Sequence, residues 1–139
     1  MNTGFLLDPR LAADTRPVTM LDLCEVRLME DARFAWLVLV PQRQDVVEIA
    51  DLPAPERALL WQEVDRASAV LRLAVPCDKL NLGALGNIVR QLHVHVVARR
   101  EGDAAWPGPV WGSGAAERYT DDAREALADR LREALRWLR

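Results

Sequence analysis

The sequence of 139 residues is poor in lysine, histidine and cysteine, and it has no long apolar run. Lys79 is the only lysine among 18 basic residues, and no Gly-Lys-Ser/Thr loop for nucleoside triphosphates is present. Cys24 and Cys77 are too few and too far apart for a disulfide framework or a cysteine zinc site. The longest apolar stretch, residues 34–40, is far below the ~18 residues of a membrane span.

The overall charge is weakly acidic and half of the residues are apolar. The formal net charge of −3 and a pI of about 5.4 predict no basic surface for nucleic acid. With 50% hydrophobic and 28% charged residues, the composition is typical of a folded chain and not of a disordered one. The first ten residues lack the apolar segment of a signal peptide. We therefore expect one cytoplasmic domain over residues 1–139, with no nucleic-acid or membrane partner.

The apolar pattern predicts three helices and two pairs of strands. The helices are expected over residues 6–14, over 55–75 and from Thr120 onward, the last with an apolar stripe of Leu127, Leu131, Ala134 or Leu135, and Leu138. Strands are expected over 20–30, 34–40, 80–85 and 91–99, with Gly86-Asn87 as a turn. The run 34–40 is nearly continuous apolar, which indicates a strand covered on both faces. Strand pairs separated by helices favour an α+β fold.

The only two histidines, His93 and His95, lie two residues apart in a predicted strand. Alternate side chains of a strand point to the same face, so both imidazoles share a face with Gln91, while the apolar residues between them face a core. Their Cα atoms would be roughly 6.6 Å apart, near enough for both rings to contact one phosphate or one metal ion. This arrangement favours a functional pair over two histidines without a role.

Residues 91–97, Gln-Leu-His-Val-His-Val-Val, resemble the signature of the histidine-triad (HIT) family, His-φ-His-φ-His-φ-φ, where φ is apolar. Gln91 stands at the first histidine of that signature. Further similar segments are 39–41, 81–87 and 106–108. The resemblance implies a HIT-like α+β fold, an antiparallel sheet of about five strands with helices packed on it. It also implies a homodimer with the long helix and the Trp-rich C-terminal part near the interface.

The resemblance also implies a function. Family members are nucleotide-binding hydrolases or transferases that act on the α-phosphate of nucleotide conjugates, such as dinucleoside polyphosphates or nucleoside phosphoramidates. His93 corresponds to the nucleophile that forms a nucleotidyl-histidine intermediate, which water then resolves. His95 corresponds to a donor of hydrogen bonds to phosphate oxygens. Gln91 would orient the nucleophile through its main-chain carbonyl, a group that any residue supplies. No cofactor is implied.

Other positions of the resemblance concern the leaving group and the nucleotide. Trp36 stands where many relatives carry a further histidine near the leaving group. Protonation of the leaving group must then fall to another residue, or the leaving group must already be a good one. Contacts with the phosphate are implied for Asn81, Gly86 and Asn87, and a contact with the ribose hydroxyls for Glu30.

Two alternatives stay open from the residues alone. A His-x-His pair on a strand also presents two imidazoles to zinc or manganese. A tight metal site needs three or four ligands, so carboxylates such as Glu101 or Asp103 would have to complete it. The second alternative is a protein that binds nucleotides and has lost catalysis. Metal analysis and an assay of nucleotide turnover separate these alternatives.

Overall fold

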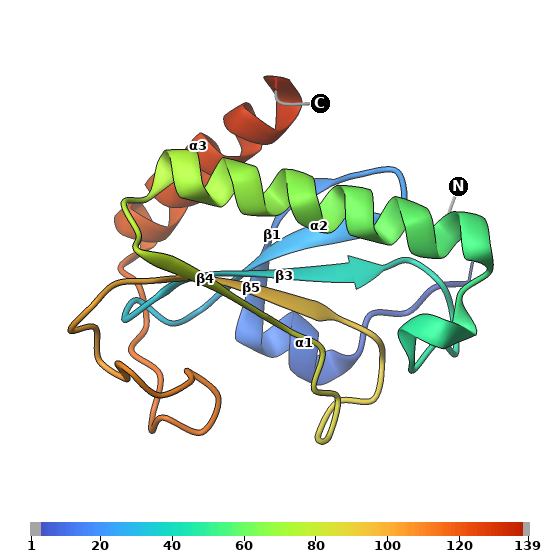
Figure 1. Ribbon diagram of the computed structural model, residues 1–139, viewed down its shortest axis with the longest axis horizontal. Coiled ribbons are helices and arrows are strands. Elements are labelled where there is room, and N and C mark those ends of the chain that lie inside the picture. The colour runs from blue at the N-terminus through green and yellow to red at the C-terminus, as the bar shows by residue number, and fades with distance from the viewer. Residues whose placement is uncertain (1–3, 138–139) are drawn as a thin grey trace.

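The computed structural model describes residues 4–137 and shows a five-stranded antiparallel sheet with helices on both sides (Figure 1). In chain order the elements are α1 (Pro9–Asp14), β1 (Thr15–Met20), β2 (Cys24–Met29), β3 (Ala35–Pro41), the 3-10 helix η1 (Ile49–Asp51), α2 (Ala54–Ala74), β4 (Lys79–Gly83), β5 (Val94–Arg99) and α3 (Asp121–Trp137). The strand order across the sheet is β1-β2-β3-β5-β4. The predicted α+β fold with about five strands is therefore confirmed.

The strand predicted over residues 20–30 is present as the shorter β2 and pairs with β3 as expected, whereas its other partner, β1, is missing from the sequence prediction. β1 is an edge strand in which only Thr15 and Val18 are buried, so it has no period-two apolar pattern. Pro17 is tolerated there because an edge strand has one side without a partner strand. α1 starts at Pro9 and not at residue 6, since Pro9 fits the first turn of a helix and Asp8 accepts the Arg10 amide N–H.

Both strands predicted within residues 80–99 are present, but their inner ends differ from the prediction. β4 ends at Gly83 and β5 begins at Val94, so Gly86-Asn87 lies in a ten-residue loop, 84–93, which is longer than the connection over residues 86–90 that the predicted strands left. The chain cannot continue β5 back to Gln91, because the Leu92 amide N–H donates to the Val46 carbonyl outside the sheet, at 3.0 Å. The loop that precedes β5 is therefore shaped by contacts that are remote in sequence.

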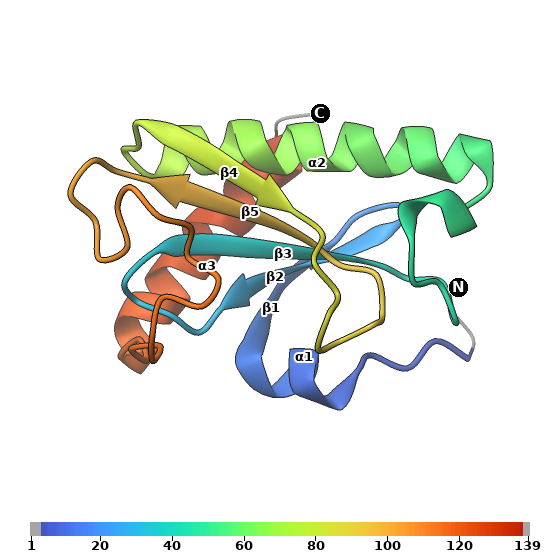
Figure 2. The same cartoon turned by 60° about the horizontal axis from the view of Figure 1, so that its bottom comes forward.

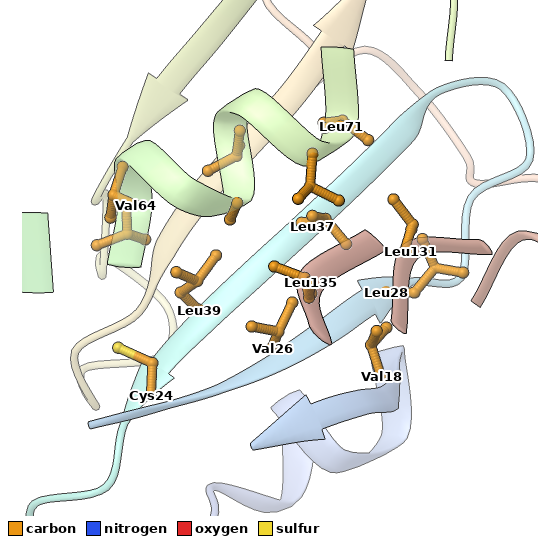
Figure 3. Packing of buried hydrophobic residues seen from close by; sticks show 14 of the residues in the cluster. Val18, Cys24, Val26, Leu28, Leu37, Leu39, Val64, Leu71, Leu131 and Leu135 are labelled. Atoms are coloured by element: carbon orange, nitrogen blue, oxygen red, sulfur yellow. The ribbon is translucent and has the colours of Figure 1, made fainter. Parts of the chain in front are cut away.

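The larger of two cores lies between the sheet and the helices α2 and α3. Figure 3 shows Leu131 and Leu135 of α3 close to Leu28 and Val26 of β2. The predicted stripe of α3 is confirmed for Leu127, Leu131 and Leu135, whereas Leu138 lies outside the described residues. The residues of the histidine strand that were expected to face a core do so: Leu92, Val94, Val96 and Ala98. No helix within residues 4–137 is long and apolar enough to cross a membrane.

The second core covers the opposite face of the sheet, the face that carries the histidines. α1 lies on this side, across the sheet from α2 (Figure 2). Its buried members come from α1, β3, β5 and the segment after β5, namely Leu11, Phe34, Trp36, Val38, Val40, Val97 and Val110. β3 is thus covered on both faces, as its apolar run predicts. The two histidines consequently lie in a largely enclosed environment.

Candidate functional site

The two histidines lie at the start of β5 and share one face of the sheet. His95 is the second residue of β5, and His93 directly precedes the strand. Their ring centroids are 4.8 Å apart with the rings edge to face, and each residue is only 6% exposed. The predicted common face is therefore present, but both imidazoles are much more deeply buried than a surface pair.

His93 is held by the main chain of the loop that precedes β5. The Nδ1 atom of His93 lies 2.7 Å from the carbonyl oxygen of Gln91. A carbonyl oxygen only accepts hydrogen bonds, so a neutral His93 carries its proton on Nδ1 and a lone pair on Nε2. An oriented imidazole with a free lone pair is the chemical form that a nucleophile requires. This is the geometry that the family resemblance implies for Gln91 and His93.

The side chain of Gln91 also makes two hydrogen bonds that the sequence did not predict. Its Nε2 donates to the Leu6 carbonyl and its Oε1 accepts from the Asp8 amide N–H, both at 2.9 Å. Gln44 accepts from the Leu6 amide N–H at 3.1 Å. The Gln91 bonds tie residues 6–8 to the loop before β5, which reaches toward α1 in Figure 2, and the Gln44 bond ties Leu6 to the segment after β3. The segment before α1 is thereby part of the site's surroundings.

Trp36 contacts His95 rather than His93. The indole Nε1 donates to His95 Nδ1 at 3.0 Å, and the two rings lie 5.6 Å apart between centroids. Trp111 packs edge-on against the same imidazole, with a centroid distance of 5.5 Å. Burial disfavours the charged imidazolium and the nearby His93 adds to this effect, which together lower the pKa of His95 to about 3. His95 is therefore a neutral ring at physiological pH.

A cavity of about 200 Å³ lies beside His93. Its lining includes Gly86, Arg90 and Gln91 from the loop before β5, together with Glu48 from the opposite wall. Gly86 has a φ of +72°, a backbone conformation that favours glycine. The structure thus brings the predicted residues Gly86 and Gln91 next to His93. It also adds Arg90, whose guanidinium can pair with a phosphate and which the sequence pattern did not distinguish from other surface arginines.

The remaining predicted contact residues do not converge on this cavity. Asn87 is an exposed residue of the same loop. Asn81, on β4, accepts a hydrogen bond from Arg99 Nη1 at 2.8 Å. Glu30 follows β2 and is paired with Arg124 of α3 at 3.1 Å, near the end of the sheet where β5 stops rather than where it starts. The partners of Asn81 and Glu30 are therefore side chains of the protein itself.

The structure gives little support to a metal centre. Within residues 4–137, no cluster of three or more His, Cys, Asp or Glu side chains is arranged to hold a metal ion. Asp103, one of the carboxylates considered from sequence, has both oxygens engaged by Arg99 at 2.8 and 2.9 Å. His95 Nδ1 accepts a hydrogen bond from the Trp36 N–H, so a neutral His95 has its proton on Nε2 and no free lone pair for a metal ion. Of the pair, only His93 then has a lone pair at Nε2.

The five-stranded antiparallel sheet and the contacting histidine pair, of which His93 lines a small cavity, agree with the fold and site that the resemblance to the histidine-triad family implies. The chain belongs to this family, because the model of the HIT domain matches residues 10–102. Proteins of this family are generally nucleotide-binding hydrolases and transferases.

Solved structures of histidine-triad proteins from three bacteria are similar to this chain over nearly its whole length. The protein from Sinorhizobium meliloti is 50% identical, over 96% of this chain and 99% of that chain, with a TM-score of 0.94. The protein from Bradyrhizobium japonicum is 44% identical, over 94% and 98% of the chains, with a TM-score of 0.92. The protein from Marinobacter aquaeolei is 39% identical, over 97% and 98%, with a TM-score of 0.93. No curated protein sequence matches the chain.

The burial of His95 predicts an unusual titration. His95 should stay neutral well below its ordinary pKa of 6.5, which a pH series of ring NMR shifts measures directly. Below pH 6.5 the unfolded chain binds a proton at this residue and the folded chain does not, so the free energy of unfolding should fall as the pH drops toward 3. His95→Gln should lose this part of the pH dependence. A midpoint near 6.5 for His95 in the folded protein would contradict the assignment.

The Gln91 side chain predicts a local effect on the segment before α1. Gln91→Ala removes the acceptor of the Asp8 amide N–H, so exchange of this amide with deuterium should become faster, by up to about tenfold for a bond worth ~1 kcal/mol. The contact between His93 Nδ1 and the carbonyl of residue 91 should persist. Gln44→Ala is the matched control, because it frees only the Leu6 amide. Unchanged exchange at Asp8 would show that the Gln91 bonds are not formed in solution.

Proposed function

We propose that the protein is a nucleotide-binding hydrolase or transferase that acts on the α-phosphate of a nucleotide conjugate through a nucleotidyl-histidine intermediate. The observation that carries this proposal is the 2.7 Å contact between His93 Nδ1 and the Gln91 carbonyl oxygen. It leaves the Nε2 lone pair available in a neutral ring, as a nucleophile at neutral pH requires.

The reaction has two displacements at phosphorus. In the first, the Nε2 lone pair of His93 forms an N–P bond while the bond from phosphorus to the leaving group breaks. The positive charge that develops on the ring is stabilised by the Nδ1–H donated to the Gln91 carbonyl. In the second, a water oxygen attacks phosphorus, the N–P bond breaks and a water proton is released. The products are a nucleoside monophosphate and neutral His93; an acceptor other than water would make the reaction a transfer.

Several residues are suited to the phosphate. The Nε2–H of a neutral His95 is a hydrogen-bond donor for a phosphate oxygen, and Arg90 at the cavity adds positive charge. Gly86 lines the same cavity and Asn87 follows it, so we propose that their loop lies against the phosphate. The proposed contact of Glu30 with ribose requires its ion pair with Arg124 to open. A contact of the Asn81 side-chain oxygen with a ligand likewise requires its hydrogen bond with Arg99 to break.

The residues of the site are best suited to a substrate in which a phosphoanhydride bond is broken. No third histidine is present in the chain, and Trp36 has an indole N–H that donates a hydrogen bond but does not protonate a leaving group. A nucleoside polyphosphate leaves as a stable anion, whereas the amine of a phosphoramidate needs a proton in order to leave. Of the two substrate classes, we therefore expect dinucleoside polyphosphates to react faster than nucleoside phosphoramidates.

One observation favours a second candidate function, nucleotide binding without turnover. His95 is enclosed by Trp36 and Trp111, and the cavity is lined by His93 but not by His95. A phosphate that binds in this cavity against His93 alone lacks the hydrogen bond from His95. A protein that binds phosphate in this way would hold a nucleoside monophosphate and leave conjugates intact.

The direct test is release of a nucleoside monophosphate from a panel of both conjugate classes by wild type and His93→Ala. Wild type should turn over, and His93→Ala should lose turnover while it keeps ground-state binding, measured as a rise in melting temperature with added nucleoside monophosphate. His95→Ala should slow turnover by roughly 100- to 1,000-fold, as loss of one donor to a developing charge does.

Trapping the intermediate supplies the control. Labelled nucleotide should remain on wild type and not on His93→Ala when the reaction is stopped in alkali, because an N–P bond to imidazole hydrolyses in acid. Binding without turnover in wild type would establish the second candidate. Equal losses in the His93 and His95 variants together with loss of a stoichiometric metal would establish the metal alternative instead.

We also propose that the protein is a homodimer that uses α2 and the Trp-rich C-terminal part. Trp61 on α2 is 48% exposed and Trp137 at the end of α3 is 76% exposed, which is unusual for such large apolar side chains. Light scattering at micromolar concentration should give twice the chain mass, and Trp61→Arg should weaken the dimer. Gln62→Arg, at the neighbouring exposed position, is the matched control. A monomeric mass for wild type would refute the dimer.

A further inference from the structure

The hydrogen bond between Trp36 and His95 determines where the proton of His95 resides. Trp36 Nε1 lies 3.0 Å from His95 Nδ1, and both residues are buried, at 7% and 6% exposure. An indole N–H donates hydrogen bonds and does not accept them. His95 Nδ1 must therefore offer its lone pair, and the single proton of the neutral ring is on Nε2.

His93 is in the opposite state. Its Nδ1 faces the Gln91 carbonyl, which only accepts, so the neutral ring of His93 has its proton on Nδ1 and its lone pair on Nε2. The two imidazoles, 4.8 Å apart, are therefore different tautomers although they lie two residues apart on one face of the sheet. At Nε2, one ring has a nucleophilic lone pair and the other a hydrogen-bond donor. Each tautomer is selected by one partner.

The indole of Trp36 is held in place by its neighbours. Trp36 on β3 packs edge-on against Phe34 and Trp111, at centroid distances of 6.4 Å for each pair. Trp111 can approach because the residue paired with His95 on β4 is Gly83, where an added Cβ would lie only 3.0 Å from the Trp111 ring. The aromatic side chains therefore keep the indole N–H directed at His95 Nδ1.

We propose that Trp36 is a positioning residue, which fixes the proton of His95 on Nε2 so that this ring donates a hydrogen bond to phosphate and takes no part as a base. The use of that bond at phosphate rests on the proposed function, whereas the tautomer does not. A neutral His95 that gave up its Nε2 proton would become an imidazolate, so His95 does not protonate the leaving group either. Trp36 thereby restricts the substrates to conjugates whose leaving group departs as an anion.

The tautomers can be measured in the full chain without any ligand. A long-range proton–nitrogen NMR correlation of the ¹⁵N-labelled protein at pH 7 should show His95 protonated at Nε2 and unprotonated at Nδ1, and His93 in the reverse state. A nitrogen–nitrogen coupling should also be visible across the bond from Trp36 Nε1 to His95 Nδ1. A proton on His95 Nδ1, or absence of this coupling, would overturn the assignment whether or not any variant folds.

Two variants isolate the indole N–H from the packing of the ring. In Trp36→Phe, the proton of His95 should be distributed over both ring nitrogens, while His93 keeps its tautomer because the Gln91 carbonyl is unchanged. Trp111→Phe is the matched control: it removes an indole N–H of the same aromatic cluster that has no hydrogen-bond partner among residues 4–137. It should leave His95 protonated at Nε2. An unchanged His95 in Trp36→Phe would overturn the proposal.

Activity provides a separate readout. With the best conjugate of the panel, Trp36→Phe should lower kcat by about 10- to 100-fold with a smaller change in KM, by analogy with loss of the partner that orients a metal-bound histidine. If wild type turns over no conjugate and Trp36→Phe alters the tautomer, the proposed function fails and the assignment of Trp36 stands. If wild type is active and Trp36→Phe changes neither the tautomer nor kcat, the assignment fails and the function stands.

Discussion

Burial of two imidazole rings on one strand is the constraint on which the arrangement of this site depends. A buried ring nitrogen without a hydrogen-bond partner is costly, so each Nδ1 must find one within the protein. His93 uses the carbonyl of Gln91, which comes from its own main chain, and His95 uses Trp36, which comes from the neighbouring strand. Since one partner only accepts and the other only donates, the two histidines have their protons on different ring nitrogens. The fold thus differentiates the pair through two uncharged hydrogen-bond partners.

The parts of the molecule that follow from local sequence were predictable. The long helix α2, the stripe of α3 and the two-residue alternation around His93 are encoded by apolar spacing within a few turns or residues. β1 was not predictable, because an edge strand with Arg16 and Pro17 carries no alternating signal. The family signature located the histidine pair for the same reason: it is a local pattern.

The contacts that give the site its character are remote in sequence. The Trp36–His95 bond joins residues 59 positions apart, and the bonds of Gln91 to the segment before α1 span more than 80. The resemblance indicated a missing histidine at Trp36 and a main-chain role at Gln91, yet neither the indole donor nor the amide side chain could be assigned a partner from one sequence. Only the register of β3 against β5, with Trp36 opposite Val97 and Val38 opposite His95, brings the indole next to the imidazole.

The side chain of Gln91, at the first position of the histidine motif, also determines that the segment before α1 lies next to the site. A glutamine amide offers a donor and an acceptor side by side, so Gln91 can bond to a carbonyl and an N–H of one extended segment, as a neighbouring strand does. A neutral imidazole has its donor and acceptor on nitrogens that point in different directions and cannot make this pair of bonds. Residue 91 and residues 6–8 therefore form one structural unit: with histidine at position 91, the segment before α1 would have to be held by other contacts.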